Sequence, residues 1–227
     1  AGIDIEIDEI RGVIIDLNGE ILAQSTVSIR GKNERKYIMS RVKQVIEKLL
    51  AEKDYQKRVI GIGVGMHGIV DYAAGVSVYP PAFDWKELPV ADIIQSQFDL
   101  PVIIENNVRA LTFAENWFGL GEKFRNFICL KIGSGIGSGI FTEGRLYRGT
   151  SNSAGEIGHI MVDEDGPLCS CGNYGCLESM ASIPAVVERT VKALKQGAES
   201  KLTDMITDLE QLNLDTLLQA AEIGDDL

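Results

Sequence analysis

Residues 155–178 read GEIGHIMVDEDGPLCSCGNYGCLE, and the spacing of their glycines, acids and cysteines is the most specific pattern in the chain. One imidazole and three thiols fall within 18 residues of this stretch: His159, Cys169, Cys171 and Cys176. Such a set completes the tetrahedral coordination of a structural zinc ion and leaves no position open for a catalytic water. Gly172 and Gly175 permit the tight turns that wrap the chain around one ion. We therefore predict a structural Zn2+ site.

Two other interpretations of these cysteines remain open from the sequence. A disulfide would join two of the thiols, although a reducing compartment disfavours one. The cysteines could instead be buried as small apolar side chains. A fourth potential ligand, His159, lies close to the three cysteines in the sequence, and this favours the zinc site.

The composition is that of a globular protein. The 227 residues are 45% hydrophobic and 24% charged, which excludes a disordered chain. Four cysteines are too few for a disulfide-stapled mini-protein, and no apolar run approaches the ~18 residues that span a bilayer. The net charge of −11 argues against nucleic-acid binding by this segment, because contacts with phosphates need clustered Lys and Arg. We expect a cytoplasmic location.

Outward from the cysteine stretch, the apolar patterns predict alternating strands and helices. We expect strands over residues 2–7, 9–16, 20–28, 59–64, 101–105, 127–132 and 139–142. Asn18-Gly19 predicts a two-residue hairpin turn. One helix face is marked by Tyr37, Val42, Val45, Ile46, Leu49 and Leu50. Further helices are expected over 108–118 and 183–197.

Gly119-Leu120-Gly121 interrupts these patterns, and we place a domain boundary there. The two expected lobes are residues 1–118 and residues 119–227. The first residues already read as a strand, and the last ones read as an unfinished helical unit. We therefore expect the chain to be a fragment of a longer protein that lacks a C-terminal part.

The stretch 155–178 resembles the signature of the ROK family, which combines bacterial sugar kinases with sugar-responsive transcriptional repressors. The run from Leu130 to Ile140, followed by Gly144-Arg145 and Gly149, resembles the family's other signature. The resemblance implies an α/β, actin-like (ribonuclease H-like) sugar-kinase fold of two lobes with a ligand cleft between them.

Two positions depart from the kinase pattern of this family. Its kinases have a Gly-Gly-Thr turn near the ATP phosphates, where this chain has Glu6-Ile7-Asp8-Glu9. Carboxylates there would repel a phosphate chain. The kinases also have a catalytic Asp where this chain has Asn107, whose amide is no base near pH 7. These changes remove phosphoryl transfer and leave groups that hydrogen-bond a sugar hydroxyl.

The glycine-rich run from Gly133 to Gly139 allows two interpretations. It resembles a phosphate cradle, and the same glycine density is also typical of a tight hairpin. The hairpin is the interpretation we favour, with residual nucleotide binding as the alternative.

By the same resemblance, the sugar contacts fall on Gly68, Asn106, Asn107, Glu156, His159 and Glu178. His159 would both hold zinc and touch the sugar. Without the resemblance, Glu156 and Glu178 would be interpreted as surface or helix-capping carboxylates. Trp85 could stack on a sugar face or pack under a loop.

The resemblance implies that this chain is the effector-binding part of a ROK-type repressor, most like the xylose repressors. Operator DNA would be bound by a winged helix-turn-helix that precedes the first strand, and the protein would be a homodimer or tetramer. A monosaccharide would be the effector. The alternative is an ATP-dependent sugar kinase, and a third possibility is a sugar-binding protein that controls another protein.

Overall fold

The computed structural model describes the backbone of residues 1–227 and every side chain except those of Lys53, Asp54 and Gln56. The residues group into two compact units. One consists of Ala1–Leu130 with Ser138–Gly155, and the other of Lys131–Gly137 with Glu156–Leu227.

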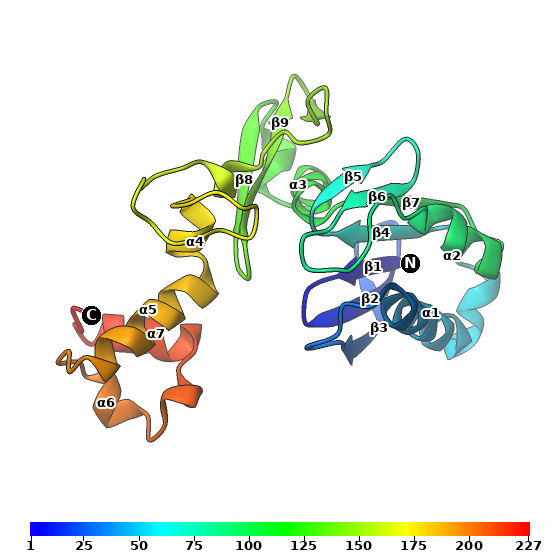
Figure 1. Cartoon of the computed structure of the whole chain (residues 1–227). Helices are drawn as coiled ribbons and strands as arrows, with labels where there is room; N and C mark the ends of the chain where they lie inside the picture. Colours follow the sequence, from blue (N-terminus) through cyan, green and yellow to red (C-terminus); the bar gives the residue numbers. More distant parts are fainter. The chain divides into compact units, whose positions relative to one another are not determined.

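A five-stranded sheet forms the centre of the first unit. Its order is β3 (Ile21–Ser28), β2 (Glu9–Ile15), β1 (Gly2–Ile5), β4 (Ile62–Met66) and β7 (Val102–Asn106). The strands β1, β2 and β3 pair in antiparallel fashion, whereas β1, β4 and β7 run parallel. The carboxyl ends of three parallel strands therefore meet at one edge of the sheet (Figure 1).

Helix α1 (Arg35–Ala51) packs against β1, β2 and β3. Its buried residues recur at helical spacing: Ile38, Val42, Val45, Ile46, Leu49 and Leu50. Tyr37, which was predicted on this face, is only partly buried and lies under the Arg41 guanidinium at 4.9 Å. Gly12 of β2 lets the helix approach closely, because a Cβ there would lie 2.7 Å from Leu49 Cδ1.

The remaining elements of the first unit surround this sheet. They are η1 (Glu52–Lys57), β5 (Ile69–Asp71), β6 (Val76–Tyr79), α2 (Val90–Phe98), α3 (Asn107–Phe118) and η2 (Leu120–Lys123). Helix α2 packs against β6 and β7, and α3 packs against β4 and β7. The short strands β5 and β6 form a hairpin of their own.

A three-stranded sheet follows, with the order β10 (Arg145–Tyr147), β9 (Ile136–Thr142) and β8 (Phe127–Ile132). Gly139 of β9 lies against the Thr112 side chain of α3, where a Cβ would clash. Gly121 similarly lies against the Phe127 ring. Because of these contacts, residues beyond 118 belong to the first unit. The limits of the two units therefore differ from those of the predicted lobes 1–118 and 119–227. The position of the lobe boundary stays a prediction.

The second unit is mainly helical. Its elements are η3 (Ile157–His159), α4 (Leu177–Ala181), α5 (Ile183–Lys195), α6 (Leu202–Met205), η4 (Leu209–Gln211) and α7 (Leu214–Glu222). A small core of Leu202, Leu212 and Ala220 packs against apolar residues of α5, including Val187 and Val191. Within the described residues of both units, every helix is too short or too polar to cross a membrane.

The structure corrects two predicted strands. The strand expected over 59–64 is β4 at Ile62–Met66, because pairing with β7 starts at Ile62 and pairing with β1 at Gly63, while Ile60 is 81% exposed. The strand expected from 139 begins at Ile136, so part of the glycine-rich run lies within β9.

Candidate functional site

Asn106 ends β7 and begins α3. Its side-chain oxygen accepts hydrogen bonds from the backbone N–H groups of Val108 at 3.0 Å and Arg109 at 3.2 Å. Its Nδ2 donates to the carbonyl of Gly68 at 3.0 Å. Asn106 is buried. Its side-chain oxygen caps the N-terminus of α3, and its Nδ2 holds the loop after β4 in place.

Gly68 has a backbone conformation that favours glycine, with φ of +84°. A Cβ at this position would lie 2.8 Å from the Cα of Pro80 and would strike the carbonyl of Tyr79. The loop after β4 is therefore packed against the end of β6. The Gly68 carbonyl faces Asn106 as a result.

Asn107 is partly buried at the first position of α3. Its Nδ2 donates a hydrogen bond to Glu6 Oε1 at 3.2 Å. Glu6 follows β1 directly, so two of the three parallel strands each supply one member of this pair. From the sequence, Glu6 was interpreted only as a residue that repels phosphate, and its contact with Asn107 was not predicted.

Glu105 lies between two guanidinium groups. Its Oε1 accepts from Arg109 Nε at 2.8 Å, and its Oε2 accepts from Arg148 Nε at 2.8 Å. The Arg109 side chain is 2% exposed, and its Nη1 donates to the carbonyl of Asn152 at 2.7 Å. Glu105 therefore supports the strand end and ties β7 to residues 148–152.

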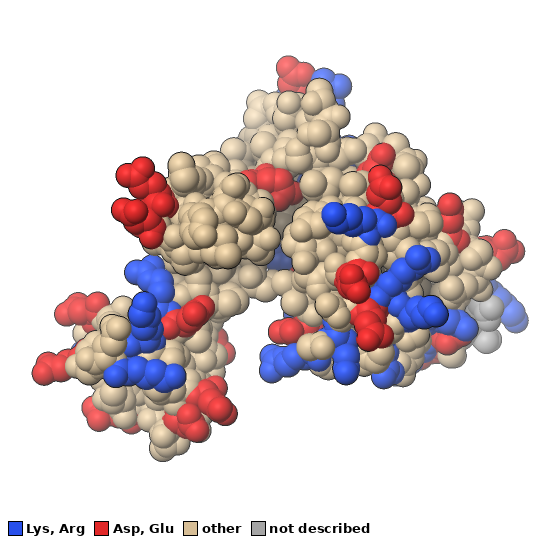
Figure 2. All heavy atoms as spheres, in the orientation of Figure 1, with Lys and Arg blue, Asp and Glu red and all other residues tan. Residues whose placement is uncertain are grey.

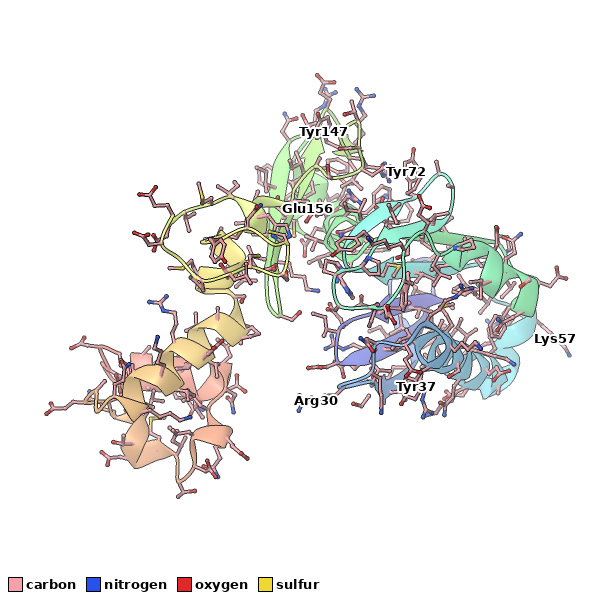
Figure 3. All side chains as sticks on the ribbon, viewed as in Figure 1. Arg30, Tyr37, Lys57, Tyr72, Tyr147 and Glu156 are labelled. Carbon is pink, nitrogen blue, oxygen red and sulfur yellow. The ribbon has the colours of Figure 1, made fainter. Side chains whose placement is uncertain are left out.

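Arg148 was not predicted as part of the site. Its guanidinium carbon lies 4.0 Å from the centre of the Tyr72 ring, which is a cation–π contact. Tyr72 lies at the β5–β6 turn (Figure 3). The sequence signal that points to Arg148 is its position directly before Gly149, which belongs to the family's other signature. The contact of Arg148 with Glu105 could not be predicted, because the two residues are 43 positions apart in the sequence.

Trp85 is buried and stacks on Phe83 with ring centroids 4.6 Å apart. Its Nε1 donates to Ser77 Oγ at 3.1 Å. The His67 ring lies 4.7 Å from Phe83. Trp85 therefore packs under the loop, which was one of its two predicted roles.

The metal ligands predicted from residues 155–178 come together in the second unit. The ligand atoms of His159, Cys169, Cys171 and Cys176 all lie within 4.8 Å of one another. Cys169 Sγ is 3.6 Å from His159 Nδ1, and Cys171 Sγ is 3.7 Å from Cys176 Sγ. Three sulfurs and one ring nitrogen at this spacing fit a tetrahedral zinc ion.

The thiols of the cluster have different environments. Burial raises the pKa of Cys176 to about 12, with further increases from the neighbouring Cys171 and Cys169. A backbone hydrogen bond at Asn173 lowers the pKa of Cys171. A bound cation would stabilise all three thiolates, and this relieves the cost of gathering them.

The two ring nitrogens of His159 face different groups. Nδ1 faces the cysteine cluster, whereas Nε2 is 4.0 Å from Glu156 Oε2. A zinc ion on Nδ1 would therefore leave Nε2 facing the Glu156 carboxylate. The metal cluster and one predicted sugar-binding carboxylate are thus linked through a single imidazole.

Glu178 connects the glycine-rich turn to the metal loop. Its Oε2 accepts from the backbone N–H of Ile136 at 2.9 Å, and its Oε1 accepts from Ser170 Oγ at 3.3 Å. A Cβ at Gly135 would lie 3.3 Å from the Glu178 carboxyl carbon and closer to its oxygen. Glycine at 135 is therefore what allows the carboxylate to reach this turn.

The run from Gly133 to Gly139 forms the turn between β8 and β9, which are hydrogen-bonded neighbours. Gly133 N–H donates to the carbonyl of Gly135 at 2.9 Å. The hairpin interpretation of this run is confirmed. Its residues Gly135 and Gly139 are explained by close packing against Glu178 and Thr112.

The predicted sugar-binding residues thus form two sets, each within one unit. Gly68, Asn106 and Asn107 lie together in the first unit. Glu156, His159 and Glu178 belong to the second unit, where His159 is also one of the four metal ligands. The structure places Glu6 against Asn107 and Ser170 against Glu178. Arg148 contacts Glu105, the residue before Asn106.

The chain is similar to curated transcriptional regulators. The chain is 32% identical over 224 residues to the "Xylose repressor" of Caldicellulosiruptor bescii, covering 98% of this chain and 56% of the relative. It therefore spans about half the length of the curated relatives it matches.

Two solved structures share the fold. A ROK family glucokinase from Streptomyces griseus, in complex with glucose and AMPPNP, matches with a TM-score of 0.87 and 29% identity over 99% of this chain and 71% of that chain. A ROK family transcriptional regulator, a homologue of the E. coli MLC protein, matches with a TM-score of 0.84 and 27% identity, covering 99% of this chain and 56% of that one. The predicted α/β, actin-like fold class is confirmed. Since the family's sequence pattern also matches residues 1–226, the chain belongs to the ROK family.

Proposed function

We propose that this chain is the sugar-binding, effector-responsive part of a transcriptional repressor. The pairing of Asn107 with Glu6 supports this function best, because it puts hydroxyl-binding groups at the ends of parallel strands where phosphoryl transfer would need a base and a phosphate site. The similarity to xylose repressors agrees with it.

The sugar contacts we propose are those predicted from the sequence: Gly68, Asn106, Asn107, Glu156, His159 and Glu178. Asn107, with its second N–H and its carbonyl, can donate to one hydroxyl and accept from another. Asn106 contributes mainly by position, since its oxygen caps α3 and one of its N–H groups holds Gly68.

Structural zinc is the cofactor we propose, held by His159, Cys169, Cys171 and Cys176. The ion would supply rigidity and no chemistry at the sugar, since four protein ligands fill a tetrahedral shell. It would fix His159 so that Nε2 stays beside Glu156. Sugar binding and metal content should therefore change together.

Regulation would follow from differential affinity. A sugar that binds one conformational state more tightly shifts the population toward it, and operator affinity changes with the population. Operator DNA would be bound by a separate N-terminal winged helix-turn-helix, in a cytoplasmic homodimer or tetramer. The net charge of −11, and the mixing of acidic and basic side chains over the face shown in Figure 2, agree with a segment that does not itself hold DNA.

The alternative function is an ATP-dependent ROK sugar kinase, which the similarity to the glucokinase structure favours. Against it stand the carboxylates of Glu6, Asp8 and Glu9 at the turn after β1, together with Asn107 at the position of the base. A kinase would need a different base and a phosphate site away from this turn.

A thermal-shift panel separates the two functions. The zinc-loaded protein is heated with each of a dozen monosaccharides, with and without Mg-ATP. One sugar at 100 times its dissociation constant should add about 2.7 kcal/mol to the stability, with no effect of ATP. Sugar-dependent ADP formation at ordinary enzymatic rates would instead establish the kinase.

A further inference from the structure

The Glu6 carboxylate reaches across one strand of the central sheet. The register pairs Asp4 with Gly65 and Gly65 with Glu105, so these three residues lie side by side on β1, β4 and β7. Glu6 and Asn107 lie two residues further along the outer two of these strands. Adjacent strands are about 4.8 Å apart, so their backbones are separated by roughly 10 Å, with β4 between them.

Gly65 lies on β4 between these two strands. A Cβ at Gly65 would lie 3.5 Å from Asp4 Oδ1 and 3.6 Å from the Cα of Asn107, which are ordinary contact distances. The middle strand therefore has no side chain of its own beside Asp4 and Asn107. The Glu6 side chain joins β1 to the start of α3, and its Oε1 accepts from Asn107 Nδ2 at 3.2 Å.

This contact orients the Asn107 amide. Its Nδ2 is directed at a carboxylate, so its Oδ1, at the opposite end of the planar amide, points away from Glu6 as an acceptor. A carboxylate accepts several hydrogen bonds at once, so the contact with Asn107 does not use up the capacity of Glu6. The pair therefore combines a charged and a neutral acceptor at the carboxyl ends of parallel strands, where α/β sheets bind their ligands.

We infer that Glu6 is a ligand-binding residue, and that Glu6 and Asn107 together accept hydrogen bonds from two adjacent hydroxyls of an unphosphorylated sugar. This inference rests on the proposed function and specifies its ligand class. Hydroxyl-to-carboxylate hydrogen bonds are the stronger kind, so Glu6 contributes affinity as well as selectivity. A sugar phosphate with its phosphate near Glu6 and Asp8 is repelled, because like charges a few ångströms apart are unfavourable even in water.

The neighbouring acid Asp8 offers a matched control. It lies two residues from Glu6 on the same turn, its side chain is 56% exposed, and its Oδ2 pairs with Arg30 Nε at 3.7 Å. Asp8→Asn removes the same charge as Glu6→Gln without touching Asn107. A difference between the two variants therefore reports the position of the carboxylate and not the net charge of the turn.

The test is isothermal titration of the zinc-loaded protein with the monosaccharide that gives the largest thermal shift, and with the 6-phosphate (or 5-phosphate, for a pentose) of that sugar. Wild type should bind the free sugar more tightly than its phosphate. Glu6→Gln should weaken binding of the free sugar by about ten- to a hundredfold, since a buried hydroxyl loses a charged partner. Asp8→Asn should stay within about twofold of wild type.

Glu6→Asp is a second variant that keeps the charge and shortens the side chain by one methylene. It should also lose affinity, because the carboxylate no longer reaches Asn107. Circular dichroism and zinc content verify that the variants fold. If wild type binds the sugar and both Glu6 variants bind it equally well, Glu6 is not a ligand-binding residue, although the sugar-binding function stands. A preference of wild type for the sugar phosphate also overturns the inference, and the absence of binding by any monosaccharide overturns the function with it.

Discussion

Glu105 Oε2 accepts a hydrogen bond from Arg148 Nε at 2.8 Å, between residues 43 positions apart. The same carboxylate accepts from Arg109 Nε through its other oxygen, also at 2.8 Å. One acid therefore joins the end of β7, the first turn of α3 and the residues that follow β10. This contact therefore fixes the strand end that carries Asn106 and Asn107, within the first unit.

Replacement of Arg148 by alanine should destabilise the protein by about 1–2 kcal/mol, because Glu105 loses a partner in a largely buried setting. Urea unfolding measures this change. Arg145→Ala is the control, since Arg145 and its partner Glu143 are 80% and 76% exposed and such pairs contribute little. An equal loss of unfolding free energy in both variants would show that the contact with Glu105 adds no more stability than an exposed ion pair does.

Gly12→Ala should destabilise the protein by about 1–3 kcal/mol, because the added Cβ would collide with Val45 and Leu49 of α1. Gly63→Ala on β4 is a matched control, with its nearest contact, the carbonyl of Ala1, 4.0 Å away. Thermal unfolding of both variants distinguishes close packing from a general cost of substitution in the sheet. An unchanged melting temperature for Gly12→Ala contradicts the tight packing of α1 on β2.

Cys171→Ser should remove the metal and weaken sugar binding together, because the ion holds His159 beside Glu156. Metal analysis and sugar titration measure the two effects in one preparation. Cys129→Ser is the control, since this residue is a half-buried strand cysteine outside the cluster. Full sugar affinity in a metal-free Cys171 variant would disprove the coupling.

A chelator should strip the metal more readily at pH 6 than at pH 8. Burial raises the pKa of Cys176 to about 12, so its thiol is protonated at both values when the ion is absent. The ion must displace that proton, and proton release makes metal affinity fall as the pH falls. Competition with a chelator whose own pH dependence is known provides the measurement, and a flat profile would argue against thiolate ligation.

Glu156→Ala should weaken sugar binding by about 1–3 kcal/mol and leave the zinc content unchanged, because Glu156 is no metal ligand. The exposed Glu164 lies in the same loop, and Glu164→Ala should bind sugar as wild type does. Titration calorimetry compares the three proteins. Loss of zinc in the Glu156 variant would mean that its effect on the sugar is indirect.

Asn107→Asp should not create a kinase. The restored carboxylate could serve as a base, yet Glu6, Asp8 and Glu9 would still oppose an ATP phosphate chain. The new carboxylate would also lie against Glu6 in place of the amide that contacts it. A coupled assay for ADP checks this expectation, and robust phosphorylation by this variant would refute the role assigned to the turn after β1.

Local patterns were sufficient for several elements. The helical spacing from Tyr37 to Leu50 predicts α1, and the one difference is that Ile38 is buried while Tyr37 is only partly buried. The metal ligands were also predicted, because all four lie within one short stretch. By contrast, α2 and the β5–β6 hairpin were missed, since these elements are short and lie in a segment rich in proline and turns.

The sequence by itself determined the chemistry that is close along the chain: the four candidate metal ligands, the adjacent amides of Asn106 and Asn107, and the carboxylates after β1. Only the tertiary structure decided which of these groups meet. Glu6 contacts Asn107, 101 residues away, because β1 and β7 flank β4 in a parallel sheet. Strand order and register set such contacts, and neither is encoded in the spacing of any single motif.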